Sequence, residues 1–313
     1  MAELALVGDI GGTNSRFGLV QPGSTAIRDI TVLKNRNFGS LEQAIGHYVK
    51  SQGIGSLAAA AIAVAGPAQG EVVSLTNYDW SFTRESLRRT AKASRFRLLN
   101  DFEALALSLP SLAGSDVVQI GGETSPKPAV KIVLGPGTGL GMATLAPQLG
   151  GRWMVLPGEI GHTTLPVVTQ EEFDWRQIMS RPGVAFEAEH AVTGGGLLQM
   201  YRAIAPLGPL TTPETIGQAA LAGTDAAAVR TVEQFIVWLA RIAGDAAMTL
   251  QAHGGVYLAG DIAASLTPML QTGPFRTIFQ GKGPLAHILR PIPVYVIVDR
   301  HAALKGCASA IAE

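Results

Sequence analysis

Cysteine is almost absent from this chain of 313 residues, in which Cys307 is the only one. One cysteine cannot form a disulfide within the chain, and it cannot supply the several thiolates of a zinc site. Charged residues are also scarce, at 15% against the roughly 25% of an ordinary globular protein. The 24 basic and 24 acidic side chains give a formal net charge of zero. Nucleic acids and anionic membranes bind concentrated positive charge, so neither is expected as the main partner.

Long apolar runs are missing as well. No stretch reaches the roughly 18 uninterrupted apolar residues that a membrane helix needs. The start, Met1-Ala2-Glu3, lacks the basic region and apolar core of a signal peptide. We therefore expect a cytoplasmic protein. Hydrophobic residues make up 47% of the chain and glycines number 37, enough for a large core with close packing and for two ordinary domains.

Two pairs of apolar runs are each joined by a glycine-rich turn. Residues 4–7 lead into a turn at 8–13, and a strand resumes at 17–20. Residues 129–134 lead into a turn at 135–141, and a strand resumes at 142–145. This pattern predicts two β-hairpins, and its repetition indicates a duplicated domain.

The rest of the chain alternates between strand and helix patterns, which predicts an α/β protein. Further strands are expected at 29–33, 58–64, 72–75, 96–99, 255–260 and 294–298. Helices are expected at 41–49, after a Ser40 cap, and at 83–93, 102–109, 170–182, 195–205, 214–222, 226–252 and 302–311, the last capped around Asp299.

The two glycine turns have the chemistry of a polyphosphate site. Glycines let backbone amides approach an anion without an intervening Cβ atom, and Thr13 and Thr138 add hydroxyl donors. Asp9 offers a carboxylate for hydrated Mg²⁺. One such turn is usually only a turn, but two of matching design could hold a polyphosphate from both sides. A Rossmann fingerprint would be followed by a helix, and the Lys-Ser/Thr pair of a Walker loop is absent.

Three segments carry a family resemblance. Residues 9–14 resemble the first phosphate segment of the sugar kinase, heat-shock and actin superfamily, 135–141 resemble the second, and 255–260 resemble its adenosine-contacting segment. Within that superfamily the chain is similar to the bacterial glucokinase family, of the non-zinc type, from end to end. Asp261 stands where the family commonly has a second glycine, so it either adds a negative charge near the purine or caps the next helix.

The resemblance implies ATP and Mg²⁺ as cofactors, with Asp9 holding the metal through water. The ATP-binding residues that it implies are Gly8, Asp9, Ile10, Gly11, Gly12, Thr13, Asn14, Gly137, Thr138 and Gly260.

Asn100 and Asp101 follow an apolar strand, where α/β sheets place their ligands. Taken alone, this pair is more typical of a helix cap. The family resemblance instead implies that Asp101 is the catalytic residue, accepting the proton of the sugar 6-hydroxyl or orienting it, and that Asn100 binds a neighbouring hydroxyl.

The segment 156–162 places Glu159 and His162 three residues apart among glycines. A metal site is disfavoured because no second His, Cys or Asp cluster stands nearby in the sequence, and a solvated loop is the structural alternative. The segment resembles the family's sugar-binding Pro-Gly-Glu-x-Gly-His motif. Glu189 matches a further sugar-binding glutamate, with Glu187 on the same expected helix as the alternative. The sugar-binding residues implied are Asn100, Gly139, Glu159, His162 and Glu189.

Other aromatic and polar residues have simpler expected roles. Thr76, Asn77 and Trp80 match a family pattern near the sugar, although core packing is the simpler role for Trp80. Structural roles are expected for Trp153, Trp175 and Trp238, and surface or capping roles for His47, His190, His253, His287 and His301.

Together these features predict a two-domain ribonuclease-H-like (actin-like ATPase) fold with a central cleft, the domains being 1–110 plus 299–313 and 111–298. The expected activity is ATP-dependent phosphorylation of glucose to glucose 6-phosphate, and the family implies a homodimer. The alternatives are a kinase for fructose, mannose or an N-acetylated hexosamine, and a non-catalytic sugar-sensing regulator. An actin-like assembling ATPase would have no reason to carry Glu159 and His162. The related repressor and kinase group is disfavoured because it usually carries a cysteine-rich zinc motif.

Overall fold

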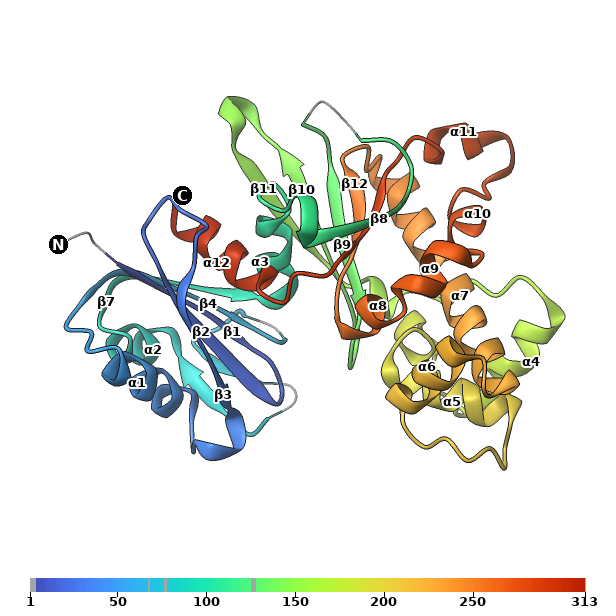
Figure 1. The fold of residues 1–313 in the computed structure, drawn as a ribbon, viewed down its shortest axis with the longest axis horizontal. Helices are drawn as coiled ribbons and strands as arrows, with labels where there is room; N and C mark the ends of the chain where they lie inside the picture. The colour runs from blue at the N-terminus through green and yellow to red at the C-terminus, as the bar shows by residue number, and fades with distance from the viewer. Residues whose placement is uncertain (1–3, 67, 76–77, 125–127, 313) are drawn as a thin grey trace. The chain divides into compact units, whose positions relative to one another are not determined.

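The computed structural model describes residues 4–66, 68–75, 78–124 and 128–312 (Figure 1). Thr76 and Asn77 lie outside these residues. The chain divides into two compact units, one formed by residues 1–114 and 299–313 and the other by 115–298. The division into domains expected from the sequence stays a prediction. Within the described residues, no helix is both long and apolar enough to cross a membrane.

The first unit is built on a five-stranded sheet with the order β3-β2-β1-β4-β7. β1 pairs antiparallel with β2 and parallel with β4, which in turn pairs parallel with β7. The strands are β1 (Ala5–Ile10), β2 (Asn14–Val20), β3 (Arg28–Lys34), β4 (Leu57–Val64) and β7 (Ala93–Asn100), with a separate pair β5 (Val72–Ser74) and β6 (Ser81–Thr83). The helices are α1 (Leu41–Ser51), α2 (Arg84–Thr90), α3 (Asp101–Ser108) and α12 (Ala302–Ala312).

Helices cover both faces of this sheet. α1 and α2 pack on one face, and α3 and α12 on the other (Figure 1). The central strands β1 and β4 are accordingly buried almost throughout, as expected for strands with both faces covered. Ser40 caps α1 by accepting a hydrogen bond from the amide of Gln43, which confirms the predicted cap.

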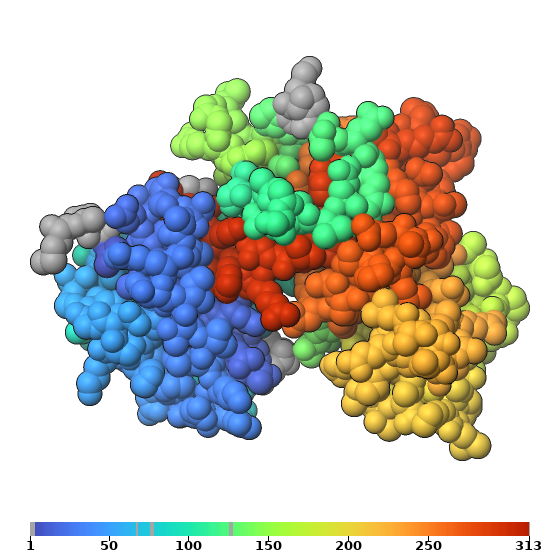
Figure 2. Space-filling model, in the orientation of Figure 1, coloured from blue at the N-terminus to red at the C-terminus, as the bar shows by residue number. Residues whose placement is uncertain are grey.

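The last helix returns to the first unit. In the space-filling view, the red C-terminal residues lie against the blue-green segment that contains α3 (Figure 2). Gly306 makes this close crossing possible, because a Cβ atom there would stand 1.7 Å from the carbonyl oxygen of Ala104. On the same helix, the fully buried Cys307 lies with its thiol 3.3 Å from the carbonyl oxygen of Gly8. α12 thus holds the helix that begins at Asp101 and the strand that carries Asp9.

The second unit repeats the sheet grammar of the first. Its strand order is β11-β10-β9-β12-β13-β8, in which a three-stranded antiparallel meander is again followed by two parallel strands, β12 and β13, while β8 pairs antiparallel at the edge. The strands are β8 (Val117–Gly121), β9 (Lys131–Pro136), β10 (Leu140–Pro147), β11 (Trp153–Gly158), β12 (Gly255–Leu258) and β13 (Val294–Ile297). The repeated topology confirms the duplication that the two hairpins predicted.

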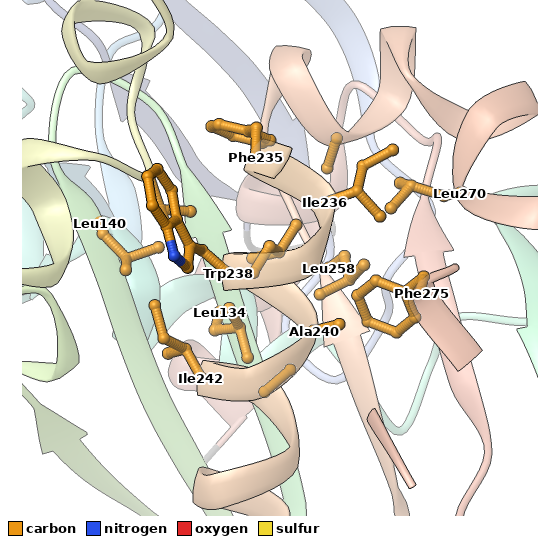
Figure 3. Packing of buried hydrophobic residues seen from close by; sticks show 14 of the residues in the cluster. Leu134, Leu140, Phe235, Ile236, Trp238, Ala240, Ile242, Leu258, Leu270 and Phe275 are labelled. Carbon is orange, nitrogen blue, oxygen red and sulfur yellow. The ribbon is translucent and has the colours of Figure 1, made fainter. Parts of the chain in front are cut away.

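Long α7 (Ala226–Leu250) is the centre of the second unit's core. It is apolar and buried around most of its circumference, while Arg230, Glu233 and Asp245 are exposed. Trp238 lies beside Leu140 of β10, and Ile236 faces Leu270 (Figure 3). The other α-helices are α4 (Gln170–Met179), α5 (Gly194–Ile204), α6 (Pro213–Ala222), α8 (Asp261–Ser265), α9 (Thr267–Thr272), α10 (Phe275–Phe279) and α11 (Ala286–Leu289). The structural roles expected for Trp80, Trp175 and Trp238 are confirmed by their burial.

The strands of both hairpins run further than the sequence suggested. β1 continues through Gly8, Asp9 and Ile10, and β9 through Gly135 and Pro136. The expected turns at 8–13 and 135–141 therefore shrink to residues 11–13 and 137–139. Backbone pairing keeps these glycines extended: Gly8 is paired with residues of β2 and of β4, and Gly135 is paired with Gly141 of β10.

Three strands were not predicted: β6, β8 and β11. β11 contains Pro157 and ends at Gly158, residues that weaken a strand pattern. It lies at the edge of its sheet, where proline is tolerated because one side of the backbone needs no partner. The segment 156–162 is therefore not the solvated loop offered as an alternative. It is the end of β11 followed by the 3₁₀ turn η4 (Ile160–His162).

Candidate active site

Hydrogen bonds from Asn35 hold the first glycine turn, residues 11–13, on its buried side, and this set of bonds is called the Asn35 clamp. The side-chain amide of Asn35 donates to the carbonyl oxygen of Gly11 at 2.8 Å, and its backbone amide donates to that of Thr13 at 3.0 Å. Its side-chain oxygen accepts from the hydroxyl of Ser15 at 2.8 Å. Asn35 and Ser15 are fully buried, whereas Thr13 is exposed. The carbonyls of the turn are thus held inward, and its exposed side remains open to a ligand.

Asn35 was not found from the sequence. It stands in the polar run Lys34-Asn35-Arg36-Asn37, which reads as ordinary surface. Only the folded chain shows that this side chain turns inward, and no local signal in the sequence distinguishes it from Asn37.

Asp9 lies near the end of β1, directly before this turn. It is paired across the hairpin with Arg16, whose Nη1 lies 3.3 Å from Oδ2 of Asp9. Both side chains are partly exposed. An aspartate at this position could hold a hydrated Mg²⁺ beside the turn, because carboxylate oxygens and water are the ligands that Mg²⁺ prefers.

Asn100 acts as the N-cap of α3, as its position after β7 suggested. Its side-chain oxygen accepts from the amides of Phe102 and Glu103 at 2.9 and 3.4 Å, while Glu103 accepts from the amide of Asn100 at 2.9 Å. The side-chain nitrogen of Asn100 donates to the carbonyl of Gly66 at 3.0 Å. That nitrogen has a second hydrogen, so capping leaves one donor for a ligand.

Asp101 is the first residue of α3 and follows the carboxyl end of β7. Its pKa is raised from 3.8 to about 6, chiefly by burial and also by the nearby negative charge of Asp9, against the opposing effect of hydrogen bonds from Phe102 and Asn100. A carboxylate that titrates near neutral pH is suited to accept a proton from an alcohol. β1 and β7 both run parallel to β4, so the first unit brings Asp9, the glycine turn and Asp101 to one edge of its sheet.

The second glycine turn, residues 137–139, meets the start of a helix. The amide of Gly137 donates to the carbonyl of Gly139 at 2.8 Å, and the amide of Gly194 donates to that of Gly137 at 3.0 Å. Gly194 is the first residue of α5, which Thr193 caps. Exposed Thr138 therefore stands beside a helix N-terminus, whose free amides and dipole favour an anion.

Gly260 lies against the same turn from β12. A Cβ atom on Gly260 would stand 3.0 Å from the carbonyl oxygen of Pro136, and its φ of 93° also favours glycine. The suggestion that Asp261 caps the following helix is wrong: the N-cap of α8 is Gly260, and no side chain bonds to the cap amides. Asp261 occupies the first helical position instead, where its charge is favoured by the helix dipole.

The second unit also gathers His162 and two glutamates. Nδ1 of His162 lies 2.7 Å from Oε2 of Glu187. One side-chain nitrogen or oxygen each from His162, Glu187 and Glu189 lies within 4.8 Å of the others, so two glutamates that are distant in the sequence lie beside this histidine. Glu189 also lies beside the turn, because a Cβ atom on Gly139 or on Gly161 would stand 3.1 Å from its Oε2.

The two glutamates are not on one α-helix, contrary to expectation. Glu189 belongs to the 3₁₀ turn η5 (Ala188–His190), and Glu187 is the cap residue before it. This short turn directs both carboxylates toward the 159–162 segment, whereas positions two apart on an α-helix would diverge. Glu159 precedes η4 and is exposed, and its charge acts on His162.

A buried ion pair anchors the chain that follows the motif. Arg241 of α7 donates from Nη1 to Glu172 of α4 at 2.7 Å and to the carbonyl of Pro166 at 3.0 Å. Glu172 also accepts from the amide of Val168 at 2.8 Å. Burial is the largest single influence and tends to raise the pKa of Glu172, but the hydrogen bonds from Arg241, Val168 and Gln234 and the charge of Arg241 together hold the pKa below its usual value. The segment between His162 and α4 is therefore tied to the core helix.

Comparison with known proteins places these features in a family. The model of the glucokinase family matches residues 6–313. The chain is 39% identical to a glucokinase of Chromobacterium violaceum, over 98% of this chain and 89% of the relative, and 37% identical to one of Marinobacter nauticus, over 98% and 97%.

The solved structures agree. The crystal structure of a glucokinase from an Antarctic psychrotroph, 28% identical, superposes with a TM-score of 0.88 and covers 99% of both chains. This likeness confirms the actin-like ATPase fold class. A sugar phosphotransferase is the enzyme class that these relatives share. On the family match and the full-length relatives, the chain belongs to the glucokinase family.

Proposed function

We propose that this chain transfers the γ-phosphoryl group of ATP to the 6-hydroxyl of glucose, with Asp101 as the group that receives or orients the hydroxyl proton. The observation that carries the proposal is the buried carboxylate of Asp101, whose pKa is raised to about 6 beside Asp9. Above that pH it is an ionised acceptor of suitable strength for an alcohol that becomes nucleophilic.

The two glycine turns would hold the phosphates of ATP. In the first unit, exposed Thr13 and the amides at 11–13 offer donors, and the Asn35 clamp keeps them in place. In the second unit, Thr138 and the start of α5 offer a second set of donors. Asp9 would hold Mg²⁺ through water, and the ion would neutralise charge on the transferred phosphoryl group. Phosphoryl transfer depends mainly on such positioning and charge stabilisation.

The sugar would be bound by Glu159, His162 and Glu189 in the second unit and by the free amide hydrogen of Asn100 in the first. Carboxylates accept hydrogen bonds from hydroxyl groups, and a site with several such acceptors disfavours analogues that lack the hydroxyls. We also infer a cytoplasmic enzyme of sugar breakdown that assembles as a homodimer, on the strength of the family resemblance.

The test is an assay of purified protein with MgATP and a panel of glucose, fructose, mannose and N-acetylglucosamine, with ADP release as the readout. Glucose should give the highest kcat/KM. Asp101→Asn should lower kcat at least about 100-fold, as expected when a general base is lost, while calorimetry still detects glucose binding. Asp29→Asn is a matched control, since it removes an exposed carboxylate at a φ of 54° that asparagine also tolerates.

Each contrary result points to a different function. Normal turnover by Asp101→Asn would remove this residue from the mechanism. A higher kcat/KM for another hexose would make the chain a kinase for that sugar. Glucose binding without any ADP release would favour a sugar-sensing regulator.

A further inference from the structure

Glu187 is held in place by backbone contacts on both sides. Its amide donates to Nδ1 of His190 at 3.0 Å, and it forms an isolated β-bridge with Thr164. The amide of the next residue, Ala188, donates to the carbonyl of Thr163 at 2.8 Å. Because Thr163 directly follows His162, these bonds fix the Glu187 backbone against the segment that carries the histidine.

The contact between the two side chains decides which imidazole nitrogen carries a hydrogen. Nδ1 of His162 lies 2.7 Å from Oε2 of Glu187. An ionised carboxylate can only accept, so Nδ1 must be the donor. Nε2 is then the nitrogen left for a ligand, and the ring is 56% exposed, so a ligand can reach it.

The charges around His162 are all negative. Glu187 and Glu189 act on it from η5, and Glu159 acts from the residue before its own turn. β10, the strand packed against this turn, has no ionisable side chain. The hydrogen bond to Glu187 is the largest of the influences that raise the pKa of His162.

We propose that Glu187 is a positioning residue that keeps His162 doubly protonated. Nε2 of His162 then offers the sugar a hydrogen-bond donor, whereas the neighbouring carboxylates of Glu159 and Glu189 can only accept. This inference rests on the proposed function. A sugar hydroxyl that donates to Glu159 or Glu189 still has lone pairs on its oxygen, and neither carboxylate can satisfy them. An imidazolium supplies the missing donor, with a charge that strengthens the bond.

Glu187→Gln is the variant that tests this role. Glutamine keeps the size and can still accept from Nδ1, but it removes the charge that favours the imidazolium. Glu233→Gln is the matched control, because Glu233 is an exposed carboxylate of the same unit, on α7, and is not among the charges that act on His162.

The first measurement follows the protonation of His162 by NMR in the full chain. The chain has six histidines, and comparison with His162→Gln identifies the signal. The pKa of His162 should fall in Glu187→Gln and stay unchanged in Glu233→Gln. An unchanged pKa in Glu187→Gln would overturn the proposal without any reference to catalysis.

The second measurement is the KM for glucose as a function of pH. In the unaltered protein, affinity should persist to higher pH than in Glu187→Gln. The variant should show a KM for glucose raised about tenfold near pH 8, as expected for the loss of one charged hydrogen bond, with kcat and the KM for ATP little changed. If the pKa of His162 fell in Glu187→Gln but the pH dependence of the KM for glucose stayed as in the unaltered protein, the proposal would also be overturned. Absence of hexose phosphorylation by the unaltered protein would instead refute the proposed function.

Discussion

Asn35→Ala tests whether the hydrogen bonds of the Asn35 clamp hold the first glycine turn in place. The substitution removes the bond from the side-chain amide to Gly11 and the acceptor for the Ser15 hydroxyl, each 2.8 Å long. It leaves the backbone bond from residue 35 to Thr13 intact. The perturbation is therefore confined to two side-chain hydrogen bonds in a fully buried position.

The magnitude follows from the burial of the partners. A buried hydroxyl left without a partner costs about 1–3 kcal/mol, and the lost bond to the partly accessible carbonyl of Gly11 adds about 1 kcal/mol. Asn35→Ala should therefore lower the free energy of unfolding of the first unit by about 2–4 kcal/mol. Ser15→Ala removes the hydroxyl that loses its acceptor in Asn35→Ala. The double variant of Asn35 and Ser15 should therefore lose less stability than the sum of the losses in the two single variants.

The functional consequence should be selective for the nucleotide. A turn whose carbonyls are no longer held inward presents its amides less uniformly, so the KM for ATP should rise about tenfold, equivalent to about 1.4 kcal/mol. The KM for glucose should change little, because the clamp does not touch the sugar-binding residues. Thermal unfolding and steady-state kinetics with each substrate varied in turn measure both effects.

Asn35→Asp supplies the sharpest control. It keeps the shape but replaces the donor to Gly11 with an acceptor and introduces a buried charge, which is unfavourable without a partner. It should be at least as damaging as alanine. If Asn35→Asp were as stable as the unaltered protein, or if Asn35→Ala left the KM for ATP unchanged, the clamp would have no role in the turn.

Two further predictions concern Asp101 and the helix behind it. Because the folded-state pKa of Asp101 is raised from 3.8 to about 6, ionising this group destabilises the fold by up to about 3 kcal/mol as pH rises through that interval. Asp101→Asn should therefore be more stable than the unaltered protein at pH 8 and equal to it below about pH 4. If the thermal unfolding midpoints of the two proteins differed by the same amount at every pH in this range, the burial argument would be contradicted. Gly306→Ala should destabilise the first unit by about 3 kcal/mol or more, since its Cβ would stand 1.7 Å from the carbonyl oxygen of Ala104. The control Gly46→Ala should be neutral or stabilising, because the nearest neighbour of its Cβ would be 3.6 Å away. Equal denaturation midpoints for the two alanine variants would refute the close-packing explanation.

Prediction from the sequence worked where a local pattern matched its environment. The two hairpins, the Ser40 cap and the long helix expected at 226–252 follow from apolar periodicity and nearby capping or glycine residues. So do the strands expected at 58–64 and 96–99, which the structure extends to Leu57–Val64 and Ala93–Asn100. It failed for β11, where proline and glycine obscure an edge strand. It also failed for the ends of the turns, because pairing with neighbouring strands keeps glycines such as Gly8 and Gly135 extended.

The candidate site also contains residues that the sequence indicated and residues that it did not. Asp101, Glu159 and His162 were indicated by the family motifs that they match, and their roles stay predictions. The contact of Glu187 with His162 could not, since 25 residues separate them and the expected helix would have pointed the two glutamates apart. Asn35 gave no signal of any kind.

The sequence by itself determined the α/β character and the duplicated hairpins, because these depend on periodicity and glycine positions within short segments, and its motifs indicated the candidate site residues. The tertiary structure alone decided which polar groups became partners, how far each strand continued and which carboxyl group lost enough solvent to titrate near neutral pH. Those outcomes depend on burial and on contacts between residues distant in the chain, which local sequence does not encode.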